Sequence, residues 1–199
     1  MHPTPTADLT QVRKWRKNTP SGDILISTST NLLDRQWIND AFATDDMYWA
    51  KRLQPDQLDL MLQHSLTLGM YKVSPAVAPS RSADSPSSPR TPSPTLEDGP
   101  REDLQQIGMA RMVTDYVTFV YLTDVYIDPE SRKDGLGKWI VACCKEVVEA
   151  TPELRRALLF TGAGMGERFY ARELGWWSVG DEAEKGLACM TFKGWGFGS

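Results

Sequence analysis

Glycines and basic residues gather in one short stretch, SRKDGLGK, between an apolar run and a helix-like run. Gly135 and Gly137 permit a left-handed backbone and let the main chain approach a ligand closely. Arg132, Lys133 and Lys138 add positive charge. The exposed amides at the start of the following helix form an anion site. Together these features predict a cradle for a phosphate group.

Two common phosphate-binding loops do not fit this stretch. A Walker loop needs the pattern G-x-x-x-x-G-K-[ST], but Gly135 and Gly137 are too close together and Trp139 follows Lys138. A Rossmann fingerprint needs a third glycine three residues after the second, where this chain has Ile140. A turn made by the glycines alone is the plain alternative.

The residues around this stretch show strand and helix patterns. Strands are predicted over residues 23–29, 66–73, 105–115, 116–128, 154–161 and 187–193. Apolar residues at helical spacing predict helices over residues 32–44, from about Pro55 onward, over 138–151 and over 166–174. The run 116–128 is apolar on both faces, which is typical of a central strand covered on each side.

A segment rich in serine and proline interrupts these patterns. Residues 74–103 cannot bury enough apolar surface to offset the entropy of ordering, so we expect a disordered loop there. The patterned sequence before this segment is too short for an independent core, so the loop is expected to interrupt one domain. We therefore expect a single domain over residues 22–199. Residues 1–21, with the basic run RKWRK, are expected to form a flexible arm.

Composition disfavours several classes of protein and of site. Hydrophobic residues make up 41% of the 199 residues, but no run approaches the length of a membrane helix. A net charge of −4 argues against a nucleic-acid surface. The start of the chain has no secretory or transit pattern, and the few histidines and cysteines lack metal-ligand spacing. We expect a cytoplasmic protein, with the nucleus left open, that binds no metal, membrane or nucleic acid.

The glycine stretch also carries a family resemblance. Its pattern R-x-x-G-x-G, formed by Arg132, Gly135 and Gly137, resembles the pyrophosphate loop of the GNAT superfamily of acetyl-CoA-dependent N-acetyltransferases. The resemblance covers about residues 23–71 and 105–177 and is closest to small stand-alone members, with the Ser/Pro segment as an insertion. It implies an α/β (α+β) fold: a mixed, mostly antiparallel central sheet flanked by helices, in which a splayed central strand pair holds CoA.

The resemblance implies which residues bind the cosubstrate, acetyl-CoA. The main chain of Val125, Tyr126 and Ile127 would pair with the pantetheine arm, and Arg132 would lie near the pyrophosphate. The backbone amides that would hold the pyrophosphate belong to Lys133, Asp134, Gly135, Leu136, Gly137 and Lys138.

Acetyl transfer to an amine needs a neutral amine, a stabilised oxyanion and a proton for the departing thiolate. By the resemblance, Tyr170 in the segment GERFYARELGW would donate that proton, and the amide of Val125 would bind the oxyanion. Asp124 is an acid in an apolar strand and must be partnered or functional. Base, substrate anchor and structural acid are all open roles for it. Cys143 and Cys144 are expected to be apolar fillers of a helix face.

The acceptor is less defined by the sequence. Asp46, Tyr48 and Trp49 lie between the two early helices, where the family closes over its acceptor, and aromatics with acids suit an amine cation. Tyr116 is a weaker candidate. Our hypothesis is an N-acetyltransferase that acetylates a primary amine, on a small molecule or a peptide, by direct attack in a ternary complex. The alternative is a noncatalytic acyl-CoA-binding or sensor module whose Ser/Pro loop docks a partner. A homo-oligomer is left open.

Overall fold

The computed structural model describes residues 9–75 and 102–179. The strands in these ranges are β1 (Lys14–Thr19), β2 (Gly22–Ser27), β3 (Leu66–Pro75), β4 (Glu102–Thr114), β5 (Phe119–Ile127) and β6 (Arg156–Leu159). The α-helices are α1 (Arg35–Ala41), α2 (Pro55–Gln63), α3 (Leu136–Glu149) and α4 (Met165–Leu174). Short 3-10 turns are η1 (Thr30–Leu32), η2 (Asp45–Met47) and η3 (Pro129–Ser131). Within the described ranges, no helix is both long enough and apolar enough to span a membrane.

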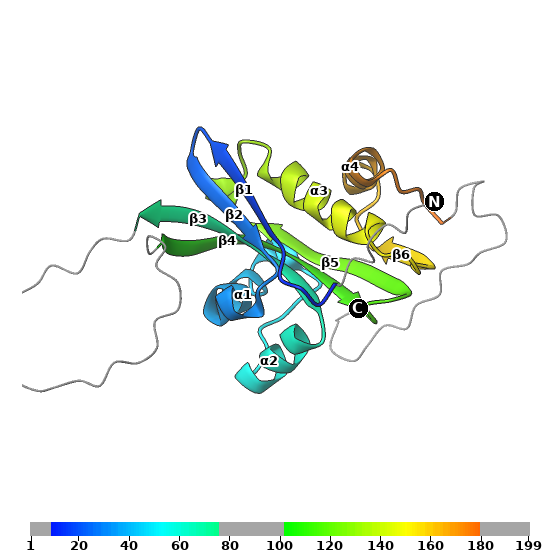
Figure 1. The fold of residues 1–199 in the computed structure, drawn as a ribbon, viewed down its shortest axis with the longest axis horizontal. Coiled ribbons are helices and arrows are strands. Elements are labelled where there is room, and N and C mark those ends of the chain that lie inside the picture. The colour runs from blue at the N-terminus through cyan, green and yellow to red at the C-terminus, as the bar shows by residue number, and fades with distance from the viewer. Residues whose placement is uncertain (1–8, 76–101, 180–199) are drawn as a thin grey trace, which may run out of the picture.

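The strands form one sheet in the order β1-β2-β3-β4-β5-β6. Every neighbouring pair is antiparallel except β5 and β6, which are parallel. Helices α1 and α2 lie on one face of the sheet, and α3 and α4 lie on the other (Figure 1). The predicted fold class, a mixed and mostly antiparallel sheet flanked by helices, is confirmed.

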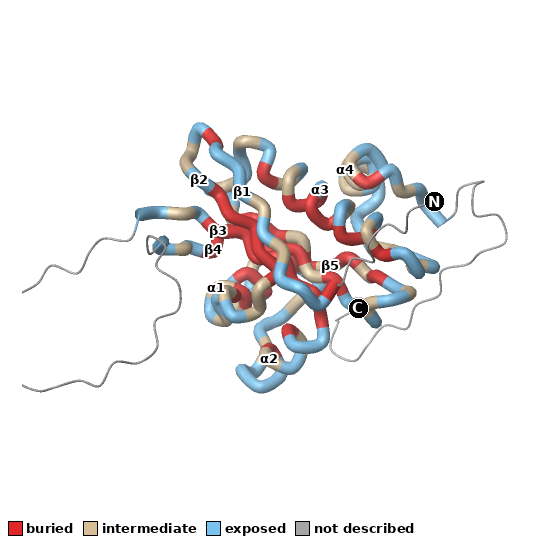
Figure 2. The backbone as a smooth tube through the Cα atoms, in the orientation of Figure 1, coloured by how far each residue is buried: buried red, intermediate tan, exposed pale blue. Residues whose placement is uncertain are grey.

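Side chains on the two faces of the sheet enter two separate cores. The residues of α3 that the helical spacing predicts as apolar are buried, among them Ile140, Cys143 and Val147, and they pack on the even-numbered residues of β3. The other core lies under α1 and α2 and includes Met109 and Tyr126. Figure 2 shows the buried residues concentrated along the central strands and on the sheet-facing side of α3.

Strand β1 corrects part of the prediction of a flexible arm over residues 1–21, of which residues 1–8 lie outside the described residues. Lys14–Thr19 pairs along its whole length with β2. Trp15 packs partly buried against the α3 core, and its Nε1 donates a hydrogen bond to Glu146 Oε2 at 2.7 Å. Arg16 forms an ion pair with Glu102 at 2.6 Å. The basic run is ordered because its partners lie elsewhere in the chain, which local charge patterning does not reveal.

The Ser/Pro segment is shorter than predicted at both ends. Ser74 and Pro75 complete β3, and Glu102 and Asp103 begin β4, where they pair with each other across the two strands. Residues 76–101 lie outside the described residues, as does the strand predicted over 187–193.

Strand β5 carries an irregularity that shapes the site. Met109 pairs with Tyr126 and Arg111 pairs with Thr123, so one residue of β4 faces two residues of β5, Asp124 and Val125. This is a β-bulge, and Asp124 adopts a positive φ of 49° within it. Bulges re-aim the side chains beside them.

The parallel pairing of β5 with β6 is short. It begins at Phe119 and Arg156 and ends at Leu122 and Leu159, whereas β5 continues to Ile127. In the described part of the chain, the β6-side edge of β5 beyond Leu122 has no strand partner. The predicted splayed strand pair is therefore present.

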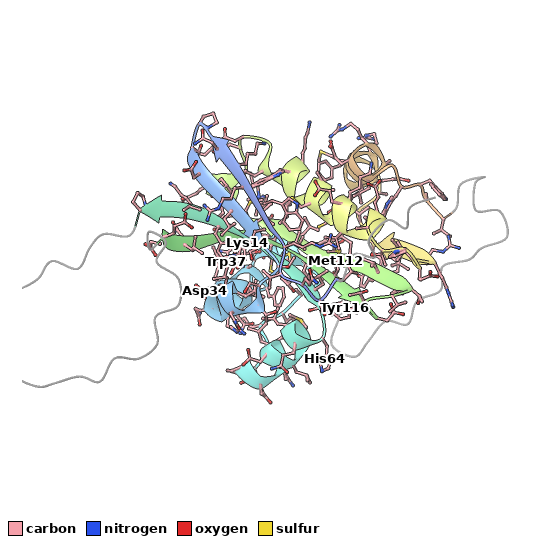
Figure 3. The ribbon with its side chains drawn as sticks, viewed as in Figure 1. Lys14, Asp34, Trp37, His64, Met112 and Tyr116 are labelled. Carbon is pink, nitrogen blue, oxygen red and sulfur yellow. The ribbon has the colours of Figure 1, made fainter. Side chains whose placement is uncertain are left out.

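Helix α1 holds the far end of β5 in place. Asp34 caps this helix by accepting a hydrogen bond from the Trp37 amide at 3.0 Å. The Trp37 Nε1 then donates to Asp128 Oδ2 at 3.1 Å, just after the strand ends. Figure 3 shows Asp34 and Trp37 at the α1 end of the sheet and Tyr116 at the opposite end.

Candidate functional site

The predicted phosphate loop joins β5 to α3 beside a cavity. Its lining residues surround a volume of about 300 Å³ and are Ile127, Arg132, Lys133, Gly135, Leu136, Gly137, Lys138 and Phe169. The backbone turns into the helix through two left-handed residues, Asp134 with φ 57° and Gly135 with φ 70°. All of these lining residues except Phe169 were predicted from the sequence. Phe169 comes from α4, and only the packing of α4 beside α3 brings it here.

Gly137 provides a test of whether this loop fits a ligand. It lies inside the first turn of α3 without a positive φ, where glycine is less favourable than alanine. A Cβ built on Gly137 would meet no atom within 4 Å, so neither packing nor conformation requires a glycine. No side chain caps the helix start at Gly135, although the Leu136 amide donates to the Lys133 carbonyl oxygen at 3.2 Å. With Lys133 and Lys138 alongside, these residues fit a diphosphate group.

Arg132 keeps 44% of its side chain exposed, but its guanidinium group contacts the protein at several points. Its Nε donates to the carbonyl oxygen of Ile127 at 2.8 Å, and its guanidinium lies 5.5 Å from the centre of the Tyr126 ring. The same guanidinium pairs with the carboxylate of Asp46. Arg132 therefore links the end of β5 to the η2 segment.

Asp124 lies buried at the β5 bulge, with 6% of its side chain exposed. Arg111 Nε donates to its Oδ2 at 2.7 Å, and Trp49 Nε1 donates to its Oδ1 at 3.1 Å. Thr123 Oγ1 donates to the same Oδ1 at 3.2 Å. Of the three open roles, this geometry most directly supports a partnered structural acid beside the splay.

The other acceptor candidates divide into two groups. Tyr48 is 76% exposed and meets Trp49 edge-on, with ring centres 5.0 Å apart, while Asp46 pairs with Arg132. These three residues therefore gather at the splayed end of β5. Tyr116 does not join them, because it lies in the β4–β5 turn with a φ of 64° and packs on the α3 core.

Comparisons with known proteins identify the family of this chain. The profile described as the Acetyltransferase (GNAT) family matches residues 90–176. A curated protein of Gibberella zeae named "Putative acetyltransferase FG08082" is 36% identical over 154 residues, which cover 77% of this chain and 78% of that protein. The chain belongs to the GNAT acetyltransferase family. A crystal structure from Xanthomonas campestris, described as a GNAT-family acetyltransferase, has a TM-score of 0.56 at 25% identity, covering 85% of this chain and 93% of its own.

Tyr170 has a setting in this GNAT protein that keeps its hydroxyl protonated. It lies half-buried on α4, next to Phe169, whose ring centre is 5.1 Å away. Burial, with a smaller contribution from the thiol of Cys144, raises the pKa of Tyr170 to about 12. A tyrosine of this kind retains its proton at neutral pH, as a proton donor must.

The adjacent cysteines of α3 pack into the core of the GNAT domain. Cys143 and Cys144 are both buried. Burial raises the pKa of Cys143 to about 12 and raises the pKa of Cys144 as well. A nucleophilic cysteine needs a lowered pKa, so neither thiol is suited to act as a nucleophile.

Sequence reasoning missed two residues of this site, Arg111 and Phe169. Arg111 was detectable in principle, because it is a lone charge in the strand run MARMV, where a buried charge needs a partner. No group of three or more His, Cys, Asp or Glu side chains suited to a metal ion occurs among the described residues.

Proposed function

We propose that this GNAT protein is an acetyl-CoA-dependent N-acetyltransferase that acetylates a primary amine by direct transfer in a ternary complex. The observation that carries the proposal is Gly137. Its side-chain position is open space, next to uncapped helix amides and two lysines, at the end of a splayed strand. A glycine inside a helix lowers stability relative to alanine, and neither packing nor φ requires a glycine at position 137. A ligand that approaches this part of the backbone closely would account for it.

Different residues of the chain would bind different parts of acetyl-CoA. Of the amides from Lys133 to Lys138, that of Lys133 donates to the Ser131 carbonyl oxygen and that of Leu136 to the Lys133 carbonyl oxygen. The other amides of this stretch would hold the diphosphate of CoA. The unpaired edge of β5, Val125 to Ile127, would continue the sheet through the amide groups of the pantetheine arm. Phe169, which lines the same cavity, would add an apolar contact.

Bound acetyl-CoA would supply the thioester: the amine nitrogen bonds to the acetyl carbon, the carbon–sulfur bond breaks, and the sulfur leaves as the thiol after gaining a proton. We assign the donation of that proton to the Tyr170 hydroxyl. We propose that the Val125 amide donates a hydrogen bond to the acetyl oxygen, which becomes negative during the transfer. Asp124 already accepts hydrogen bonds from Arg111 and Trp49, so we propose that water, rather than Asp124, accepts the proton that the amine loses. The net products are an amide and free CoA.

Isothermal titration with acetyl-CoA and with CoA tests donor binding, and release of free thiol from acetyl-CoA in a panel of primary amines tests transfer. We expect micromolar binding of acetyl-CoA and thiol release with at least one amine. No binding at millimolar acetyl-CoA would exclude the proposal. Binding without any transfer would favour the noncatalytic module instead.

A further inference from the structure

The bulge at Asp124 exchanges the two faces of β5. Before the bulge, Val120 and Leu122 belong to the α3 core. After it, Tyr126 belongs to the core under α1 and α2, although its number is also even. Side chains on a strand alternate with a period of two, so one extra residue moves every later side chain to the opposite face. Asp124 therefore lies at the crossover.

The peptide that follows Asp124 lies where β5 lacks strand partners on both sides. Among the described strands, neither Asp124 nor Val125 is in register with a residue of β4, although their neighbours on both sides are. The pairing with β6 has already ended at Leu122. The Val125 amide, the proposed donor to the acetyl oxygen, belongs to this peptide. The direction of the peptide follows from the backbone angles of Asp124, whose φ of 49° is uncommon for a residue other than glycine.

Three donors hold the Asp124 side chain in this conformation. Arg111, which pairs with the strand residue just before the bulge, donates from Nε to Oδ2 at 2.7 Å. Trp49 Nε1 and Thr123 Oγ1 donate to Oδ1 at 3.1 Å and 3.2 Å. A residue in an uncommon backbone conformation persists only when its surroundings hold it there, and such residues gather at functional sites.

Stability alone does not account for a buried ion pair at this position. Arg111 and Asp124 are 14% and 6% exposed, so both charges have lost most of their water. That loss offsets much of their attraction, and apolar residues of similar volume often give equal or greater stability. What the pair provides, and apolar packing does not, is a fixed direction for the Asp124 side chain through its hydrogen bonds.

We infer that Arg111 and Trp49 are positioning residues for acetyl transfer. Through Asp124 they hold the bulge in the conformation that presents the Val125 amide to the acetyl oxygen. The inference rests on the proposed N-acetyltransferase function and adds to it two residues that act through a third.

The ¹³C NMR signal of the thioester carbonyl carbon tests this inference without any amine. The probe is acetyl-CoA labelled at that carbon, and a hydrogen bond to the carbonyl oxygen moves the signal downfield. We expect a downfield shift when the probe binds the wild-type protein. In the double variant Arg111→Met with Asp124→Leu, and separately in Trp49→Phe, the shift should fall by about half or more. The dissociation constant for acetyl-CoA should stay within about twofold of wild type.

Trp37→Phe is the matched control for Trp49→Phe. Trp37 Nε1 also donates to an aspartate at 3.1 Å, namely Asp128, just after β5 ends. Its replacement removes the same kind of hydrogen bond away from the bulge, so the carbonyl shift should not change. Thermal melting checks that each variant is folded. Trp49 is 38% exposed, so Trp49→Phe should fold and decides the question by itself if the double variant does not.

The outcomes separate the inference from the function on which it rests. An unchanged carbonyl shift in the folded variants would overturn the inference and leave the N-acetyltransferase intact. An equal reduction in Trp37→Phe would do the same, because the effect would then come from general loosening of β5. Binding of acetyl-CoA to the wild type without a carbonyl shift would remove the Val125 amide and its positioning residues from the mechanism. Absence of acetyl-CoA binding would overturn the proposed function and the inference together.

Discussion

Arg111 and Asp124 form an ion pair across β4 and β5, with 2.7 Å between Arg111 Nε and Asp124 Oδ2. Their side chains are only 14% and 6% exposed. The pair sits at the bulge where β5 leaves β6, and Trp49 Nε1 donates to the same carboxylate. The segment that carries Trp49 and the central strand β5 are therefore joined through one buried charge pair.

Breaking this pair from one side should be costly. Arg111→Ala leaves a buried carboxylate without its partner, and we expect the free energy of unfolding to fall by about 3–5 kcal/mol. The double variant Arg111→Met with Asp124→Leu removes both charges and should recover much of that loss. Urea denaturation measures both. Equal losses in the single and double variants would show that the charges are not coupled.

The two glycines of the phosphate loop should respond in opposite ways to alanine. Gly137→Ala fills open space in a helix, so it should stabilise the free protein by about 0.5–1 kcal/mol. The same change should weaken acetyl-CoA binding by about tenfold, which is about 1.4 kcal/mol.

Gly135→Ala is the matched control for that experiment. Its φ of 70° is strained for alanine, so the free protein should lose about 1 kcal/mol. Thermal melting and isothermal titration measure the two effects. Unchanged acetyl-CoA affinity in Gly137→Ala would count against the diphosphate cradle.

The protonation of Tyr170 should be visible at alkaline pH. Burial raises its pKa to about 12 in the folded protein, above its value of about 10 in an unfolded chain. The raised pKa favours the folded state, a contribution fully present below about pH 10 and lost as pH rises toward 12. Tyr170→Phe should therefore lose less stability than the wild type between about pH 10 and 12, as measured by melting at each pH.

The same variant tests the proposed proton donor. Tyr170→Phe should lower kcat by about a hundredfold and leave KM for acetyl-CoA nearly unchanged. Tyr71→Phe is the control, because Tyr71 is also a buried tyrosine with a raised pKa but has no assigned role. A kcat that is equal in Tyr170→Phe and wild type would remove Tyr170 from the mechanism.

Tyr71 itself supports a separate prediction about stability. Its hydroxyl is buried and has no hydrogen-bond partner among the described residues. Replacing it by phenylalanine removes an unsatisfied group, so Tyr71→Phe should raise the free energy of unfolding by about 1 kcal/mol. A loss of similar size would mean that a bound water satisfies the hydroxyl.

Gly69 is required by the position of the Tyr71 ring. A Cβ on Gly69 would lie 2.1 Å from the Tyr71 hydroxyl, so Gly69→Ala should destabilise by about 1–3 kcal/mol. Thermal denaturation compares Gly69→Ala with Gly137→Ala, where the open space predicts the opposite sign.

Local patterns were enough to predict most elements and the glycine loop between β5 and α3. The apolar spacing along α3 and the continuous apolar runs of β2 and β3 depend on neighbours within the same element, so local sequence patterns locate them. The R-x-x-G-x-G loop is equally local, because Arg132, Gly135 and Gly137 act through one turn and one helix start. The sequence by itself therefore determined the family resemblance, the order of most elements and the position of the loop between β5 and α3. The family pattern also singled out residues 46–49.

Only the tertiary structure decided the partnerships between distant residues. The basic strand β1 is ordered through Trp15 and Glu146, which stand 131 residues apart in the chain. Asp124 is neutralised by Arg111 because a bulge on β5 re-aims it, and a bulge has no signal in local hydrophobicity. Phe169 lines the cavity beside the β5–α3 loop because α4 packs beside α3. Each of these depends on register and packing between elements, which one-dimensional spacing does not encode.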